Sequence, residues 1–169
     1  MIKRIAVALF LFASLNAFGA NYTGKWQLDL DASKEIPERM KARLASWQLD
    51  VKHDAKVLAV DVHIAQADGS KLDNHFDYKL DGTDSPIELM ARTPDGERKI
   101  QGVAVAKVEE NGAIALTTTT ELPMPGGDTF KRVSSEQWTL SADGKTLTVH
   151  RVDPNPMGTN EYDLVFRKQ

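Results

Sequence analysis

The sequence contains no cysteine in its 169 residues, and this absence limits how the chain can be held together. Without cysteine there are no disulfide bonds, no thiol nucleophile and no lipid attached through a cysteine side chain. The folded part must therefore be stabilised by burial of apolar side chains. With 41% hydrophobic residues, the composition allows such a core.

Long hydrophobic runs are also missing, apart from one short run near the start of the chain. Basic residues at 3–4 precede an apolar run over 5–13, and small residues around Gly19 follow it. This order is typical of a secretory signal peptide, and the run is too short to span a bilayer. We therefore expect cleavage of residues 1–20, one mature domain over 21–169 without an integral membrane segment, and a periplasmic or secreted protein.

The chain has no excess or block of basic residues. It carries 21 Lys and Arg against 24 Asp and Glu, and loss of the signal removes two basic residues and no acidic ones, so the net charge falls from −3 to about −5. The two signs are interspersed along the mature chain. We therefore expect neither nucleic acid nor an anionic membrane surface as a partner, and we expect a monomer.

Motifs of the common enzyme classes are missing as well. The chain has no Gly-x-Ser-x-Gly elbow, no phosphate-binding loop and no His-Glu-x-x-His motif. The glycines at 126–127 follow a Pro-Met-Pro sequence and are typical of a wide turn rather than a phosphate cradle. We therefore expect a protein that is not an enzyme and that needs no cofactor.

What the sequence does contain is a series of short alternating runs separated by turn signals. Dipeptides such as Asn111-Gly112 and Asp143-Gly144 favour hairpin turns between antiparallel strands. The pattern predicts an all-β chain, a single antiparallel up-and-down barrel of about 8–10 strands, closed so that no sheet edge is left free. The expected strands are Lys25–Leu30, Ala45–His53, Lys56–Gln66, Leu72–Leu80, Pro86–Arg92, Lys99–Val108, Ala113–Leu122, Thr129–Leu140, Lys145–Val152 and Asn160–Arg167.

One segment, between the first and second expected strands, departs from this alternation. Pro37 stands at the first turn of a short predicted helix, and Ile36, Met40 and Leu44 recur every four residues on one of its faces. This helix either plugs one end of the barrel or forms a mobile lid over a ligand entrance. The sequence leaves both interpretations open.

The turn at 143–144 sets a register for the strands on either side. A two-residue loop there places Glu136 opposite Arg151, on a face that also carries Arg132. The barrel interior therefore becomes charged towards one end, where buried charges need one another or a ligand. The pair is either a cross-strand ion pair near the barrel mouth or a polar anchor for an acidic ligand head group.

A three-residue loop at 68–70 predicts a second register. It places Val62 opposite Phe76 and Val60 opposite Tyr78 inside the barrel.

On the outer face, the same register brings two histidines and two aspartates together. His63 then faces His75, and Asp61 faces Asp77. Zinc takes such ligands, and facing aspartates repel one another without a cation. Because imidazole is also common on solvated strands, we expect a solvated polar patch and no metal, with these four residues as the metal candidates to test.

The other inward positions are mostly large and apolar, with tyrosine hydroxyls that need partners when buried. Such a lining either fills a core or surrounds a cavity, and about ten strands leave more room than eight. The leading hypothesis is a small, mostly apolar ligand bound in the interior. The residues expected to contact it are Arg151, Glu136, Arg132, Tyr78, Tyr162, Trp47 and Phe76.

The alternative is an envelope protein-interaction module with a filled core. Its function would then lie on loops, and the candidates are the proline-containing segments 153–158 and 123–127.

The first and last expected strands resemble the lipocalin signature. In that signature a Gly-x-Trp, here Gly24 and Trp26, packs its indole against an arginine of the final strand, here Arg167. A helix between the first two strands, followed by about nine more strands, is similar to fatty-acid-binding proteins. The segment 23–28 resembles small exported bacterial lipocalin-like proteins. The resemblance to this calycin superfamily implies a barrel with a small lipophilic ligand inside.

Fatty-acid-binding proteins cluster two interior arginines and a tyrosine late in the chain. Here only Arg132, Arg151 and Tyr162 could stand in for them.

Overall fold

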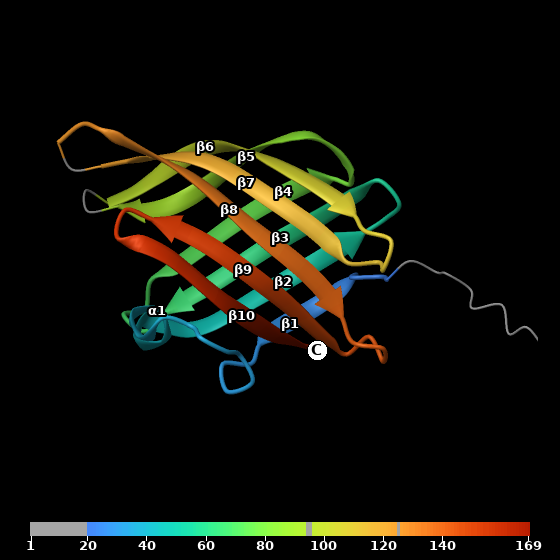
Figure 1. Ribbon diagram of the computed structural model, residues 1–169. Coiled ribbons are helices and arrows are strands. Elements are labelled where there is room, and N and C mark those ends of the chain that lie inside the picture. Colours follow the sequence, from blue (N-terminus) through green and yellow to red (C-terminus); the bar gives the residue numbers. More distant parts are fainter. Residues whose placement is uncertain (1–19, 94–95, 125) are drawn as a thin grey trace, which may run out of the picture.

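The protein folds as a curled antiparallel sheet with one short helix, seen from the side in Figure 1. The computed structural model describes residues 20–93, 96–124 and 126–169, so the predicted signal peptide, except for its last residue, lies outside the described residues. The elements are β1 (Gly24–Leu28), α1 (Glu38–Arg43), β2 (Leu44–His53), β3 (Val57–Gln66), β4 (Lys71–Lys79), β5 (Asp81–Thr93), β6 (Gly96–Val108), β7 (Ile114–Pro123), β8 (Thr129–Leu140), β9 (Thr146–Asn155) and β10 (Gly158–Lys168).

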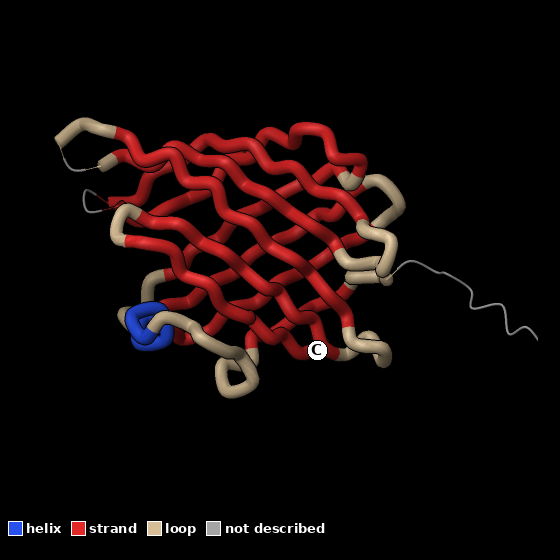
Figure 2. The backbone as a smooth tube through the Cα atoms, in the orientation of Figure 1, coloured by secondary structure: helices blue, strands red, loops and turns tan. Residues whose placement is uncertain are grey.

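The strands form an up-and-down meander in which neighbours in sequence are neighbours in space. The order is β4-β3-β2-β1-β10-β9-β8-β7-β6-β5, so the first strand pairs with the last. Figure 2 shows the strands running obliquely around the barrel, with the connecting loops gathered at its two ends. The predicted fold class, an antiparallel β-barrel with a short helix after its first strand, is confirmed.

Closure of the barrel is incomplete, which corrects the expectation that no edge is left free. In the described part of the chain no backbone ladder joins β4 to β5. The Asn74 side-chain oxygen accepts a hydrogen bond from the Met90 backbone N–H at 2.6 Å, and the Lys79 backbone N–H donates to the Ser85 hydroxyl at 2.9 Å. The pairing of β5 with β6 is irregular at residues 81–84, where β5 begins. We call this boundary the β4–β5 seam.

The predicted helix is present and begins directly after Pro37. Ile36 is buried, and Met40 and Leu44 pack against the core, so the four-residue spacing does mark the inner face. The Ala67 backbone N–H, in the β3–β4 turn, donates to the carbonyl of Arg43 at the end of α1. The helix therefore lies at one end of the barrel beside a hairpin turn, a position that fits both a plug and a lid.

The register predicted from the turn at 143–144 is confirmed. Glu136 pairs with Arg151, and Trp138 pairs with Val149. The strand alternation continues without a bulge in this hairpin, so these side chains face the interior.

The register predicted for β3 and β4 is wrong by two residues. Val60 pairs with Phe76 and Leu58 with Tyr78, because the three-residue loop is 67–69. Gly69 has a φ of +84° and takes the last loop position, which few other residues adopt at low cost. A shift of two keeps every side chain on its predicted face but changes its partner.

This shift removes the reason for a metal site on the outer face. His63 now faces Asp73, with 2.6 Å between ring nitrogen and carboxylate, and His75 faces Asp61 at the same distance. The hydrogen bond to Asp61 raises the pKa of His75. Among the described residues, no group of three or more His, Asp or Glu could hold a metal ion.

Two aromatic residues near the start of the described chain, Tyr22 just before β1 and Trp26 within it, are completely buried. The Trp26 indole N–H donates to the Tyr22 carbonyl at 3.0 Å. The Tyr22 hydroxyl lies 2.9 Å from the carbonyl of Trp138 and 3.0 Å from that of Gly112. The segment before β1 therefore ties β1 to β8 and to the β6–β7 turn.

The cation over Trp26 is Lys168, so the predicted packing of Arg167 on this indole is wrong. Trp26 and Lys168 are a direct cross-strand pair, and the lysine Nζ lies 5.3 Å from the ring centroid. Gly24 leaves room for it, because a Cβ there would come within 2.6 Å of the Lys168 Cε. We call Tyr22, Trp26 and Lys168 the end cluster.

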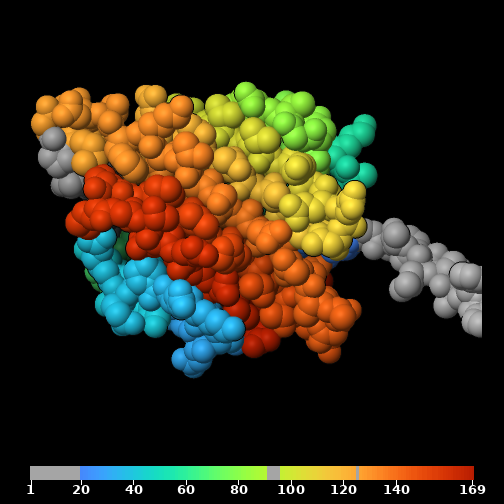
Figure 3. All heavy atoms as spheres, in the orientation of Figure 1, coloured from blue at the N-terminus to red at the C-terminus, as the bar shows by residue number. Residues whose placement is uncertain are grey.

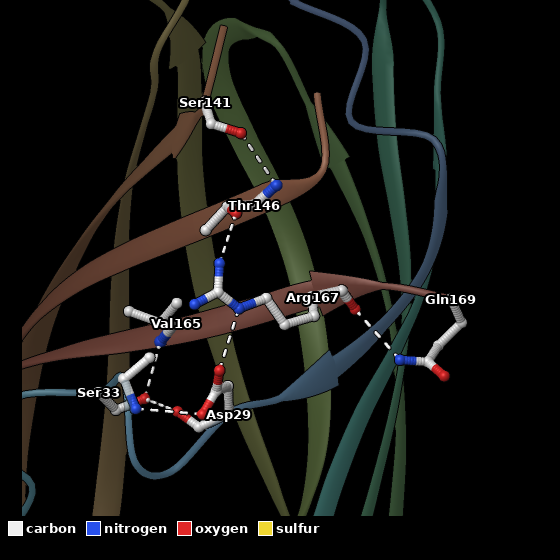
Figure 4. A network of polar contacts seen from close by, with 8 residues as sticks. Asp29, Ser33, Ser141, Thr146, Val165, Arg167 and Gln169 are labelled. Carbon is white, nitrogen blue, oxygen red and sulfur yellow. Dashed lines mark hydrogen bonds and ion pairs between the residues drawn. The ribbon is translucent and has the colours of Figure 1, made fainter. Parts of the chain in front are cut away.

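Arg167, one position earlier, points to the outside of β10. Its Nε donates to Asp29 at 3.0 Å and one terminal nitrogen donates to Thr146 at 2.8 Å (Figure 4). The bond to Arg167 holds the pKa of Asp29 below its usual range. The Ser33 hydroxyl accepts from the Val165 backbone N–H, so the segment after β1 is bound to β10, and Figure 3 shows it against that face.

Within the part of the chain that the structure describes, no helix has the length and apolar character needed to cross a membrane.

Candidate ligand-binding site

The barrel encloses a cavity of about 400 Å³. This volume lies within the range of sites that hold small molecules, roughly 300–1,000 Å³. Its apolar lining comes from strands on both sides of the barrel: Leu49, Val60, Val62, Ile64, Leu72, Ile87, Leu89, Met90, Val149, Leu164 and Phe166. The filled core expected by the alternative hypothesis is therefore not what the structure shows.

The residues predicted to contact a ligand are gathered around this cavity. Six of them line it: Arg132, Glu136, Arg151, Trp47, Phe76 and Tyr78. Tyr162 does not line the cavity, but it is buried and pairs directly with Arg151 across β9 and β10.

Aromatic side chains form the part of the lining contributed by β2, β4 and β10. The Phe76 and Tyr78 rings stack with centroids 5.6 Å apart, and Trp47 meets Phe166 edge to face at 6.1 Å. Such pairs are rigid and apolar, so they can contact a hydrocarbon without losing much conformational freedom.

Four charged residues on β8 and β9 face the interior, and we call Arg132, Glu136, Arg151 and Asp153 the wall cluster. Arg151 Nη1 lies 3.3 Å from Glu136 Oε1, and Arg132 Nε lies 2.7 Å from Asp153 Oδ1. None of the four side chains is more than 24% exposed. Their ion pairs are therefore screened far less by solvent than those on the outer face.

The electrostatics of the wall cluster extend to its aromatic neighbours. The second oxygen of Glu136 accepts a hydrogen bond from the Trp138 indole at 2.8 Å. Burial opposes the charge of Arg151, but the electrostatic effects of Glu136, Tyr162, Asp153 and Tyr78 together outweigh it, and the pKa of Arg151 is raised. Burial also raises the pKa of Tyr78 and of Tyr162, so both phenols are neutral hydrogen-bonding groups at ordinary pH.

Several buried polar atoms at the cavity have no hydrogen-bond partner in the protein. They are Trp47 Nε1, Arg132 Nε, Arg151 Nε and Asp153 Oδ1. Arg132 and Asp153 lie close enough for an ion pair but without the alignment of a hydrogen bond. Because buried polar groups are normally hydrogen-bonded, the two donors left free, Trp47 Nε1 and Arg151 Nε, can receive the polar group of a ligand.

Sequence reasoning missed three residues of this site. Asp153 follows Arg151 by two positions on the same strand, so alternation alone could have placed it inside. Trp138 lies two positions after Glu136 on β8, and its indole N–H donates to the Glu136 carboxylate, a contact that strand alternation does not reveal. Asn74 bridges the seam to Met90 and lines the cavity, and only the tertiary structure reveals this contact.

The loops named by the alternative hypothesis lie at the barrel ends. Met157, in the β9–β10 turn, is 81% exposed. In the other loop, position 125 is not among the described residues.

Comparisons with known proteins support the fold. No family model and no curated protein matches the chain. Among solved structures, the chain is similar to the zebrafish ileal bile acid-binding protein, crystallised in complex with cholic acid, with 16% identity and a TM-score of 0.50. The match covers 88% of this chain and 98% of that one.

At 16% identity this likeness shows a shared fold, an antiparallel β-barrel, and it supports the barrel predicted from the resemblance at the level of the fold alone.

Proposed function

We propose that this protein is an exported binding barrel, periplasmic or secreted, which holds a small, mostly apolar ligand in its interior and performs no catalysis. The observation that carries the proposal is the cavity of about 400 Å³, whose lining is mostly apolar and aromatic, with a few uncharged polar side chains and with Arg132, Glu136 and Arg151 of the wall cluster. This combination suits a molecule with a hydrocarbon body and one polar group.

Two further observations support the proposal. The zebrafish protein with a similar fold was crystallised with cholic acid, a small amphiphile. The basic start and short apolar run of residues 1–20 support export.

The first experiment is native mass spectrometry of the mature protein purified from the envelope fraction of its own host. We expect a reproducible added mass that disappears on denaturation. Cleaved chain in the envelope fraction would support export, and uncleaved chain in the cytoplasm would contradict it. A clean apo mass, together with no saturable uptake of the uncharged fluorescent probe N-phenylnaphthylamine, would overturn the binding function and favour the exposed loops.

A pair of variants locates the binding. Val62→Phe fills part of the cavity, whereas Val133→Phe adds the same ring at an exposed position on β8. We expect probe affinity to fall by about tenfold or more in the first variant and to stay within about twofold in the second. Equal effects would place the probe outside the cavity.

A further inference from the structure

The charges inside the barrel balance one another. Arg132 and Arg151 are matched by Glu136 and Asp153, each arginine within ion-pair distance of one carboxylate. Arg132, Glu136 and Arg151 are the charged residues among the described residues that line the cavity, and Asp153 does not line it but pairs with Arg132. The interior therefore carries no net charge for a charged ligand to neutralise.

The carboxylate of Glu136 is fully engaged by the protein. One of its oxygens lies 3.3 Å from Arg151 and the other accepts from the Trp138 indole. A ligand carboxylate that approached Arg151 would lie beside this buried negative charge, and it would lose its hydration without gaining a free counterion. A ligand ammonium group would meet the guanidinium groups with the same difficulty.

The unpartnered atoms at the cavity suit an uncharged polar group instead. The Trp47 indole nitrogen is buried without a partner, and an indole N–H can only donate. Arg151 also has a buried Nε without a hydrogen bond, whereas Arg132 Nε and Asp153 Oδ1 are held 2.7 Å apart in their own ion pair. A hydroxyl or amide oxygen can accept from the free donors of Trp47 and Arg151, and it brings no charge of its own.

We infer that the ligand is an uncharged amphiphile whose polar group is a hydroxyl or amide, and that the wall cluster discriminates against a carboxylate and an ammonium group on the same hydrocarbon chain. This inference rests on the proposed binding function.

The test is displacement of N-phenylnaphthylamine from the wild-type protein at neutral pH by four compounds with one hydrocarbon chain: dodecanol, dodecanamide, dodecanoate and dodecylamine. We expect the alcohol and the amide to displace the probe at about tenfold lower concentration than the two charged compounds. Dodecanoate binding as tightly as dodecanol would overturn this inference and leave the binding function standing. Failure of the probe and all four compounds to bind would overturn the binding function itself.

A double variant tests the same inference through an expected gain in dodecanoate binding. Glu136→Gln with Asp153→Asn keeps the shapes of both side chains but leaves the two arginines uncompensated. We expect dodecanoate affinity to rise by about tenfold, while dodecanol affinity stays within about twofold. No rise for dodecanoate in the folded variant would overturn the inference.

The matched control changes the same net charge on the outer face. Asp29→Asn with Glu88→Gln removes two carboxylates that pair with Arg167 and Lys99 outside the barrel. We expect no change in the order of the four compounds. A similar rise in dodecanoate affinity here would attribute the effect to overall charge and contradict the role of the wall cluster. If the interior double variant does not fold, the wild-type series decides alone.

Discussion

The end cluster and the wall cluster both place polar atoms inside the same barrel, but their hydrogen bonding differs. In the end cluster the donors of Trp26 and Tyr22 each meet a backbone carbonyl. In the wall cluster Arg151 Nε has no hydrogen-bond partner, and Arg132 Nε meets Asp153 Oδ1 only in an ion pair without hydrogen-bond alignment. A satisfied cluster stabilises a fold, whereas a partly satisfied one keeps capacity for a ligand. The comparison separates what holds this barrel together from what it can bind.

The largest expected effect comes from the end cluster. Trp26→Ala removes an indole that is fully buried among core residues, and we expect a loss of about 3–5 kcal/mol in the free energy of unfolding. Urea unfolding followed by circular dichroism measures it. The part of the variant that stays folded should still bind N-phenylnaphthylamine. A loss below about 1 kcal/mol would mean that this indole is not a structural support.

The next effect comes from breaking one ion pair of the wall cluster. Arg151→Met leaves the buried carboxylate of Glu136 without its cation, and we expect a loss of about 3 kcal/mol. Adding Glu136→Gln, which can still accept from the Trp138 indole, should recover most of that loss. The double-mutant cycle is measured by urea unfolding. Additive losses would contradict coupling between the two charges.

The third prediction concerns alkaline pH. Burial raises the pKa of Tyr22 from 10.0 to about 12, and burial also raises those of Tyr78 and Tyr162, so all three tyrosines of the chain titrate late. Because these folded-state pKa values lie above the unfolded one, the stability from neutral phenols is complete below about pH 10 and lost as pH rises through 12. Tyrosinate absorbance should therefore appear together with unfolding. An independent titration near pH 10 in the folded protein would contradict this.

The smallest effect identifies the cation of the end cluster. Lys168→Met keeps a chain of similar length over Trp26 but removes the charge, so we expect a loss of about 0.5–1 kcal/mol. The same change at Arg167 removes its bonds to Asp29 and Thr146 outside the barrel and should leave Trp26 fluorescence unchanged. An altered Trp26 emission in Arg167→Met alone would favour the packing predicted from the sequence.

The two hairpins show how far sequence reasoning reaches. Around 143–144 the predicted pairing of Glu136 with Arg151 is correct, although the turn is longer than the assumed two residues, because the Gly144 N–H donates to the Ser141 carbonyl. At 67–69, loops beginning at 67 or at 68 both contain the same glycine, and only its position at the end of the loop decides between them. Alternation fixes the face of a residue, whereas its partner depends on backbone angles that the pattern does not encode.

A similar limit explains Arg167 and Lys168. Both are basic residues at the end of the last strand, and the lipocalin-like pattern favoured the arginine. The exact pairing of β1 with β10 places Lys168 opposite Trp26 and turns Arg167 outward. The open β4–β5 boundary likewise depends on how the strands diverge in space, which no local pattern in the chain describes.

That seam has a mechanical consequence. In the rest of the described wall, widening the barrel would break a ladder of backbone hydrogen bonds, but here β4 and β5 are bridged through side chains such as Asn74 and Ser85. The circumference of the barrel can therefore increase most easily along the β4–β5 seam, where no backbone ladder between described strands has to break. Asn74, Phe76, Ile87 and Met90 border the interior cavity and also a second hollow, whose other lining residues include His75 on β4 and Glu88 on β5. A bulkier occupant is accommodated most easily by spreading there, while the other nine strand pairings keep their length.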